Sequence, residues 1–304
     1  MSKAQLFKIK QAIADEQWEK ALNLIEPSVS ELQNNSQLNY FFVLSLYKTK
    51  HYLESLRYAN DQYNFYISSL KTQKLYFSIL LACQNFLDAY AFLENLKQVH
   101  GENVANFTSE LADKEAEVRQ QKVTLNQKLK KFYHLGDLSI TASHDVLQES
   151  KQLPATEYFQ AAQFIFLDPF VHPLIRATVL ENVISLKLSQ KIQFYWIDKQ
   201  NHEVDLAKLT RILDNQIQRK FNKLLQQRLA NQDPILLEGI VKDKNLYLSY
   251  VYPFADQVFK MPELWVNYWI DDYYGRAHAN TLENQTISKW QKKFQTLTSE
   301  LFEN

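Results

Sequence analysis

Three short stretches, spaced 34 residues apart, constrain the first third of this chain more than any other feature. They read WEKAL at 18–22, YLESL at 52–56 and FLDAY at 86–90. Each begins with an aromatic residue and has a small residue at its fourth position. Ahead of the first stretch, Leu6, Ile9 and Ile13 recur at helical spacing, and equivalent apolar residues precede the other two. The pattern therefore predicts three copies of one helix pair, each with its second helix starting near the aromatic residue.

The period of 34 residues, together with the helix pair, resembles the tetratricopeptide repeat. The chain departs from the usual repeat where Ile9, Val43 and Phe77 stand in place of the glycine of the first helix. The resemblance implies an α-solenoid of three repeats over residues 1–101. In that geometry the aromatic residue at 18, 52 and 86 closes the turn, and the small residue at 21, 55 and 89 lets paired helices approach closely.

The second half of the chain carries a further resemblance, to uncharacterised tetratricopeptide-repeat proteins of low-GC Gram-positive bacteria. It rests on four segments, which are DPFV at 168–171, YPF at 252–254, PELW at 262–265 and YG at 274–275. The likeness covers nearly the whole chain. It implies an architecture and no assigned activity.

Beyond the repeats, the sequence predicts two further regions. Residues 103–134 have the narrow apolar stripe of one long polar helix, so region 102–135 is interpreted as a capping and linking helix. A polar run after Gly136 marks the expected boundary of a helical C-terminal domain over 140–304. Pro154, Pro169, Pro234 and Pro262 are placed to open helices there. Alternating residues at 191–206 predict one small β-hairpin within an otherwise all-α fold.

Composition excludes several classes of function. Lys+Arg and Asp+Glu both number 34, and a chain without net charge is not typical of nucleic-acid-binding proteins. The four glycines are spread so widely that the closest two, Gly101 and Gly136, are 35 residues apart. A P-loop, a dinucleotide fingerprint and a nucleophile elbow all need closer glycines. The single cysteine permits no intrachain disulfide, and the sequence shows neither a signal peptide nor a membrane span. These features predict a cytosolic protein without a membrane partner.

The predicted binding site is the concave face formed by the first helices of the repeats. Aromatic and aliphatic residues flanked by lysines suit a peptide of acidic character. The candidate groove residues are Lys10, Ile13, Tyr40, Leu44, Tyr47, Lys71, Lys74 and Ser78. A clamp for a C-terminal carboxylate is not expected, because only Lys71 fits its pattern. The alternative interpretation is that Tyr40, Leu44 and Tyr47 pack against the neighbouring domain.

Other chemically capable residues favour ordinary structural roles. His134, Asp137, His144 and Asp145 have no compact metal-binding spacing, and Asp271, Asp272 and His278 do not converge on one point of a helix. Cys83 lies in an apolar helix, where a small buried hydrophobic role is expected. Ten aromatic residues at 247–274 are interpreted mainly as core, with an exposed partner patch as the alternative. We therefore predict no catalytic residues, metal or cofactor.

These observations lead to two hypotheses of function. The favoured one is a non-catalytic cytosolic adaptor that binds a protein or peptide in the groove of the repeats. The alternative is an RNA- or ribosome-associated factor that uses the basic stretches 119–131 and 211–228. The sequence does not specify the partner, the oligomeric state or the physiological process.

Overall fold

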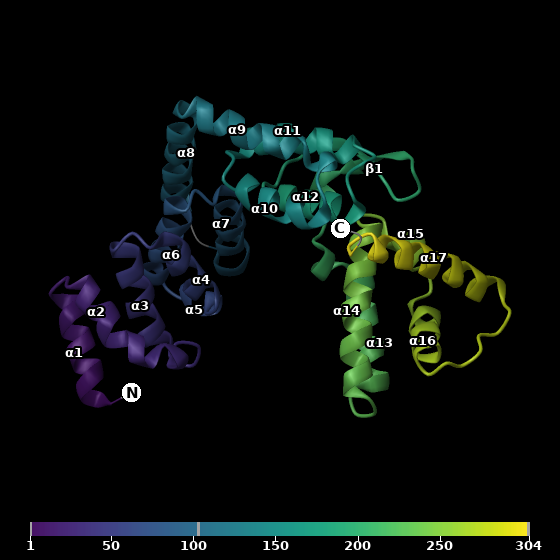
Figure 1. Cartoon of the computed structure of the whole chain (residues 1–304), viewed down its shortest axis with the longest axis horizontal. Coiled ribbons are helices and arrows are strands. Elements are labelled where there is room, and N and C mark those ends of the chain that lie inside the picture. The colour runs from purple at the N-terminus through teal and green to yellow at the C-terminus, as the bar shows by residue number, and fades with distance from the viewer. Residues whose placement is uncertain (1, 102–103, 303–304) are drawn as a thin grey trace. The chain divides into compact units, whose positions relative to one another are not determined.

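The computed structural model describes residues 2–101 and 104–302 (Figure 1). Within them the chain forms seventeen α-helices and one two-stranded antiparallel sheet. The prediction of an all-α fold with one small hairpin is confirmed. No helix in the described ranges is long and apolar enough to cross a membrane.

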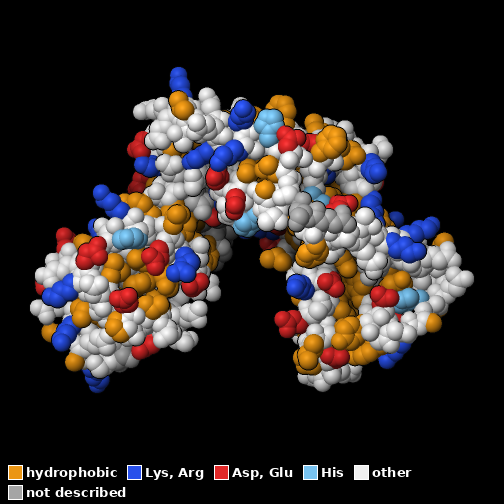
Figure 2. Space-filling model, in the orientation of Figure 1, with side chains coloured by type: hydrophobic (Ala, Val, Ile, Leu, Met, Phe, Trp, Pro, Cys, Tyr) orange, Lys and Arg blue, Asp and Glu red, His pale blue; other side chains and the backbone are white. Residues whose placement is uncertain are grey.

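The chain divides into two compact units. The first comprises Met1–Leu125 and Lys151–Ala155, and the second comprises Asn126–Ser150 and Thr156–Asn304. The division therefore falls near residue 125, whereas the sequence suggested a boundary in the polar run after Gly136. Figure 2 shows basic and acidic side chains interspersed on the visible face of the molecule, in line with the formal net charge of zero.

Helix pairs make up most of the first unit. Its helices are α1 (Lys3–Ala14), α2 (Trp18–Ile25), α3 (Ser36–Lys48), α4 (Tyr52–Asn60), α5 (Tyr63–Tyr66), α6 (Leu70–Ala82), α7 (Phe86–His100) and α8 (Ala105–Gln120), with a 3-10 helix at Glu26–Glu31. Three of these, α1, α3 and α6, begin at a side-chain cap from Ser2, Asn35 and Ser69, each of which accepts a hydrogen bond from a backbone N–H of the first turn.

The turn inside each helix pair is the same structure repeated every 34 residues. Helices α2, α4 and α7 all begin at the predicted aromatic residue, Trp18, Tyr52 and Phe86. Two residues before each aromatic, the backbone takes a positive φ of 54°, 67° and 56°, at positions 16, 50 and 84. The following N–H then donates to a carbonyl five residues back, with lengths of 2.8, 2.8 and 2.9 Å. The 34-residue repeat in the sequence therefore corresponds to a backbone turn that is repeated every 34 residues.

The small residue of each stretch is buried in its helix pair. Ala21, Ser55 and Ala89 are all fully buried. Ser55 satisfies its hydroxyl by donating from Oγ to the Val43 carbonyl at 3.0 Å. Larger side chains at these positions would force the paired helices apart, because protein interiors are close-packed.

The prediction of one long linking helix is wrong. Helix α8 ends at Gln120 and α9 (Lys122–Tyr133) starts after a break at Gln121, which has ψ 57°. The predicted first residue, Asn103, lies outside the described residues. Both sides of the break keep the apolar stripe buried, at Val118 and Leu125. A one-residue break preserves the periodicity, so the sequence pattern could not reveal it.

The second unit is mainly helical and contains the hairpin. Its helices are α9 from Asn126 onward, α10 (Ile140–Ser150), α11 (Ala155–Leu167), α12 (Pro173–Ile184), α13 (Gln216–Leu229), α14 (Pro234–Val251), α15 (Ala255–Val258), α16 (Pro262–Tyr273) and α17 (Leu282–Ser299), with short 3-10 helices at Leu135–Asp137, Leu206–Lys208 and Ile212–Asp214. Three of the predicted helix-opening prolines, 154, 234 and 262, lie at or next to a helix start, and Pro169 lies in the loop before α12. Ser139 caps helix α10 by accepting a hydrogen bond from the Ala142 N–H at 3.2 Å.

Strands β1 (Lys191–Tyr195) and β2 (Asn201–Asp205) form the predicted hairpin, with Ile192 opposite Val204. An isolated hairpin of this size is marginal, so its packing matters. The ring of Phe194 lies 5.7 Å from that of Phe166 on α11. Just after β1, the Trp196 Nε1 donates to the Val251 carbonyl of α14 at 2.9 Å. The hairpin is thus held by helices of its own unit.

Most of the aromatic residues at 247–274 form the core of the second unit. Tyr250, Tyr252, Phe259, Trp265, Tyr268 and Trp269 are buried, whereas Tyr273 and Tyr274 are 60% and 46% exposed. Phe294 on α17 is fully buried at the centre of this cluster, with its ring stacked on that of Tyr247 at 4.6 Å. The core interpretation therefore holds for six of the ten, and the exposed pair is too small for an extended patch.

Candidate functional site

The candidate site is the side of the repeats formed by α1, α3 and α6, which we name the lysine face. Helix α3 contacts both α1 and α6, so the three helices present one continuous surface. Its residues occupy equivalent positions, 34 residues apart, on the three helices. They are Lys3, Leu6, Lys10, Ile13, Gln37, Tyr40, Leu44, Tyr47, Lys71, Lys74, Ser78 and Leu81.

The eight predicted groove residues all lie on this face and differ in exposure. Lys10, Lys71 and Lys74 are exposed, while Ile13, Leu44, Tyr47 and Ser78 are half-buried. Tyr40 is the exception, because it is only 9% exposed. Solvent therefore reaches seven of the eight predicted residues, and Tyr40 acts mainly as part of the floor beneath them.

Tyr40 connects two of the three helices of the face. The Nζ of Lys71 on α6 lies 5.0 Å from the centre of the Tyr40 ring on α3. The same ring packs edge-on against Phe41 and Phe65, at 6.0 and 6.4 Å. A cation over an aromatic ring is worth about 0.5–1 kcal/mol at an exposed site. Tyr40 is thus buried by residues of its own unit, and it orients a lysine of the face.

Charge on the repeats is distributed unequally between first and second helices. Helices α1, α3 and α6 contain six lysines and no acidic residue; the lysines are Lys3, Lys8, Lys10, Lys48, Lys71 and Lys74. The acidic residues of the pairs lie on the second helices, at Glu19, Glu54, Asp88 and Glu94, and in the turn after α1, at Asp15 and Glu16. With no carboxylate one turn away on the same helix, the lysines sum to a positive potential over the face.

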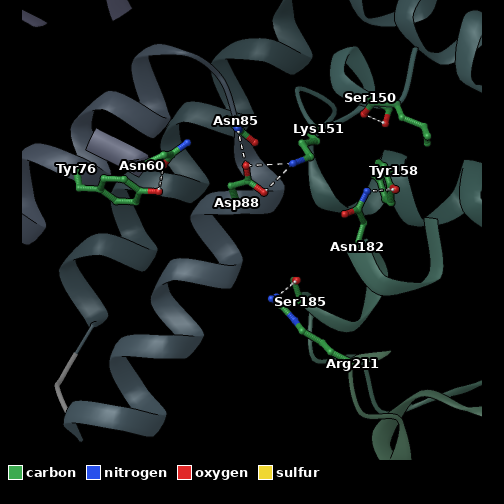
Figure 3. A network of polar contacts seen from close by, with 11 residues as sticks. Asn60, Tyr76, Asn85, Asp88, Ser150, Lys151, Tyr158, Asn182, Ser185 and Arg211 are labelled. Atoms are coloured by element: carbon green, nitrogen blue, oxygen red, sulfur yellow. Dashed lines mark hydrogen bonds and ion pairs between the residues drawn. The ribbon is translucent and has the colours of Figure 1, made fainter. Parts of the chain in front are cut away.

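Polar contacts elsewhere in the first unit hold the third repeat in place (Figure 3). Asp88 accepts from Asn85 at 2.8 Å and pairs with Lys151 at 3.2 Å. The backbone carbonyl of Lys151 in turn accepts from the Phe86 N–H at 3.0 Å. The start of α7 is therefore occupied by residues of the chain itself, whereas the lysine face is not.

The residue groups considered for metal or acid–base chemistry lack a convergent geometry. His134 and Asp137 pair with each other at 2.8 Å at an exposed position. Asp271 pairs with Arg276 and Asp272 with His278, both at 3.4 Å. Each carboxylate therefore points to its own partner.

Cys83 is half-buried, which differs from the full burial expected from its apolar helix. Burial raises the pKa of its thiol to about 11. Because the thiolate is the reactive form, this environment opposes nucleophilic chemistry at neutral pH.

In each basic stretch, two side chains already have partners within the chain, carboxylates in the first stretch and neutral oxygens in the second. Arg119 pairs with Glu115 at 3.4 Å and Lys131 with Glu149 at 2.8 Å. In the second stretch, Arg211 donates to Ser185 at 2.8 Å, as Figure 3 shows, and Arg219 donates to the Asp214 carbonyl at 2.9 Å. Side chains committed in this way are poorly placed to contact phosphates.

The segregation of lysines onto first helices can be read in the sequence once helix bounds are known, and sequence reasoning missed it. Individual lysines beside aromatic residues were noticed, but the absence of acidic residues over three separate segments was not. Comparison with known proteins adds no further constraint, since no family model, curated protein or solved structure matched the chain.

Proposed function

We propose that the chain is a non-catalytic cytosolic adaptor built on tetratricopeptide-type repeats, whose lysine face binds an acidic segment of a protein or peptide. The observation that carries this proposal is the charge of the three contiguous first helices, which contain no acidic residue and six lysines, four of them (Lys3, Lys10, Lys71 and Lys74) on the face itself. In a chain with equal numbers of acidic and basic residues, such a local excess favours an oppositely charged partner.

Apolar contacts are available alongside the charges. Leu44 and Tyr47 lie half-exposed on the middle helix, and Ile13 lies at the equivalent place on the first. Exposed salt bridges contribute only about 0–1 kcal/mol each, so lysines alone would bind weakly. We therefore expect a partner segment with both acidic and apolar or aromatic residues. The lysines would set its orientation and association rate, and the apolar residues most of its affinity.

The proposal is tested by two triple variants with the same change of charge. The face variant carries Lys10→Glu, Lys71→Glu and Lys74→Glu on the first helices. The control variant carries Lys20→Glu, Arg57→Glu and Lys97→Glu on the second helices. All six side chains are exposed, so neither set removes core packing. Each is used with the wild type to capture partners from a host lysate, with and without nuclease, followed by mass spectrometry.

We expect the wild type and the control variant to retain the same protein, and the face variant to lose it in both nuclease conditions. The binding segment of that protein should be acidic, and binding should weaken as salt is raised. Retention by the face variant, or equal loss from both variants, would refute a role for the face. Material that nuclease removes from all three would instead support nucleic-acid binding through the stretches 119–131 and 211–228.

A further inference from the structure

The second unit contains a cavity of about 510 Å³, a volume within the usual range for small-molecule sites. It lies between the start of α10, the loop at 168–172 with the first turns of α12, the end of β1 and the last turns of α17. Its wall is mixed polar and apolar, and the aliphatic lining residues include Leu138, Ile140, Val171, Ile197 and Leu297.

One wall of the cavity holds a buried arginine. Arg176 is 2% exposed, and its guanidinium donates to the carbonyls of Tyr195 at 2.8 Å, Val171 at 2.7 Å and Asp168 at 2.5 Å. Its Nε has no hydrogen-bond partner among the described residues. Three of five donors are thus satisfied by neutral carbonyls, which fix the orientation of the guanidinium. Burial lowers the pKa of Arg176, and the nearby carboxylate of Asp168 opposes that change.

Two lysines add positive charge to the same cavity. Lys199, in the turn of the hairpin, is exposed, and Lys293 on α17 is half-buried. Lys293 donates to the Ile197 carbonyl and lies over the Trp290 ring at 5.2 Å. Burial lowers the pKa of Lys293; Asp198 opposes that change and repulsion by Lys199 adds to it. Both lysines belong to the lining of the cavity, and Asp198 is a carboxylate close to Lys293.

Two further titratable residues, His172 and Glu300, line the cavity. His172 accepts from the Leu174 N–H through Nδ1 at 3.2 Å, so its proton is on Nε2, which faces the Leu297 carbonyl at 3.3 Å. Burial lowers the pKa of His172 to about 4, and the ring is neutral at pH 7. Glu300 is the one acidic residue that lines the cavity, and its side chain is 46% exposed. The lining residues thus include three cations and one carboxylate, while Asp168 and Asp198, which do not line the cavity, act on Arg176 and Lys293 from nearby.

We propose that this cavity binds a small organic anion, namely a carboxylate or phosphate group attached to an apolar body. The anionic group lies toward Lys199 and Lys293, in the field of the buried Arg176. The apolar body lies against the aliphatic wall that includes Val171, Ile197 and Leu297. This site is independent of the lysine face, because all of its residues belong to the second unit.

The test is calorimetric titration of the full chain with four probes that share an eight-carbon body: octanoate, octyl phosphate, octylammonium and 1-octanol. We expect one of the two anions to bind with a stoichiometry of one, and the cation and the alcohol to bind at least tenfold more weakly. The tighter anion identifies the headgroup as a carboxylate or a phosphate. Equal binding of octylammonium, or no binding of either anion, would overturn the proposal.

A matched pair of variants locates the site. Lys199 and Lys187 both have positive φ, 67° and 51°, and both are exposed in the second unit, but only Lys199 lines the cavity. Asparagine tolerates this backbone conformation, so Lys199→Asn and Lys187→Asn should both fold. Anion affinity should fall at least fivefold in Lys199→Asn and stay unchanged in Lys187→Asn. The same affinity in both variants would place the anion elsewhere and refute this cavity as its site.

Discussion

The two units of this protein bury their residues in different ways. In the first, each helix packs mainly on helices close in sequence, and one turn geometry recurs at residues 16, 50 and 84. In the second, the aromatic core joins residues far apart, such as Phe221 and Phe259 with ring centres at 5.2 Å and Phe259 and Phe294 at 6.1 Å. Local repetition can be read from a sequence, whereas an assembly of distant segments cannot.

The two units also differ in where their charged residues lie. In the first unit, the first helices of the pairs carry exposed lysines and no acidic residue, so these lysines can contact a large partner. The second unit encloses cations: Arg176 is 2% exposed and Lys244 is fully buried. A surface of one sign suits a macromolecule, while enclosed charge beside a cavity suits a small ligand.

The largest effect should come from the distant contacts of the second unit. Phe294 is fully buried and its ring contacts include Tyr247, Phe259 and Trp265. Phe294→Ala should lower the free energy of unfolding by about 3–5 kcal/mol, through lost burial and the cavity left behind. Urea unfolding followed by tryptophan fluorescence measures this, since only Trp18 of the five tryptophans lies outside the second unit. Phe302→Ala, at a position 80% exposed, is the control; a loss below about 1 kcal/mol in Phe294→Ala would contradict the role of the aromatic core.

The next effect concerns the buried lysine of the second unit. Lys244 donates to Asn222, and burial lowers its pKa from 10.5 to about 8. Between pH 8 and 10.5 the unfolded chain binds a proton that the folded chain has lost, so stability should rise with pH across this window. At pH 7 the charge costs about 3 kcal/mol at 1.36 kcal/mol per pKa unit.

Lys244→Met should therefore stabilise the protein by up to about 3 kcal/mol at pH 7 and remove this rise with pH. Unfolding in urea at pH 7, 8.5 and 10 measures both changes. Lys242→Met changes an exposed lysine of the same helix and should leave the rise in place. A variant that is less stable than wild type, with the same pH profile, would show that Lys244 is not a buried charge.

A smaller effect should come from the contact points of the repeats. Ala21 is fully buried between paired helices, so Ala21→Leu should cost about 1–3 kcal/mol through overpacking. Ala14→Leu adds the same atoms at an exposed helix end and should change stability by less than about 0.5 kcal/mol. Far-UV circular dichroism during urea unfolding compares the two. Equal stabilities would mean that the small residue at 21, 55 and 89 is not required for close approach.

The smallest effect should come from the repeated turn. Lys50 has φ 67°, a conformation that costs a non-glycine residue about 1–2 kcal/mol. Glycine adopts this conformation without that cost, but it loses more conformational entropy on folding, which offsets part of the gain. Lys50→Gly should thus raise stability by about 0.5 kcal/mol. Lys20→Gly, within α2, should instead lower it by about 1 kcal/mol. Differential scanning calorimetry distinguishes the two, and a loss in both would mean that the turn gains nothing from glycine.

The sequence predicted the features that depend on local patterns and missed those that do not. The starts of α2, α4 and α7 were predicted at the correct residue, because an aromatic residue and a turn recur locally. The hairpin was predicted because strand alternation is also local. The break at Gln121 was missed, since one non-helical residue leaves the apolar stripe intact on both sides.

The site residues divide in the same manner. The eight predicted groove residues remain a prediction as a binding site; the sequence placed them on the first helices because the repeat period fixes equivalent helix positions. The full burial of Lys244 and the cavity beside Arg176 were not predicted. Both depend on segments brought together by the fold, such as the loop at 168–172, the end of β1 and α17, and no local pattern marks their contact.

The central claim is that the partner binds on the first helices of the repeats, and site-specific photo-crosslinking tests it most directly. A photoreactive phenylalanine analogue is placed at Leu44 on the lysine face or at Leu53, which is 74% exposed on the second helix α4. We predict a crosslinked partner from Leu44, absent from Leu53, and lost from Leu44 when Lys71→Glu and Lys74→Glu are added. A product from Leu53 alone, or one from Leu44 that survives those two substitutions, would contradict the account.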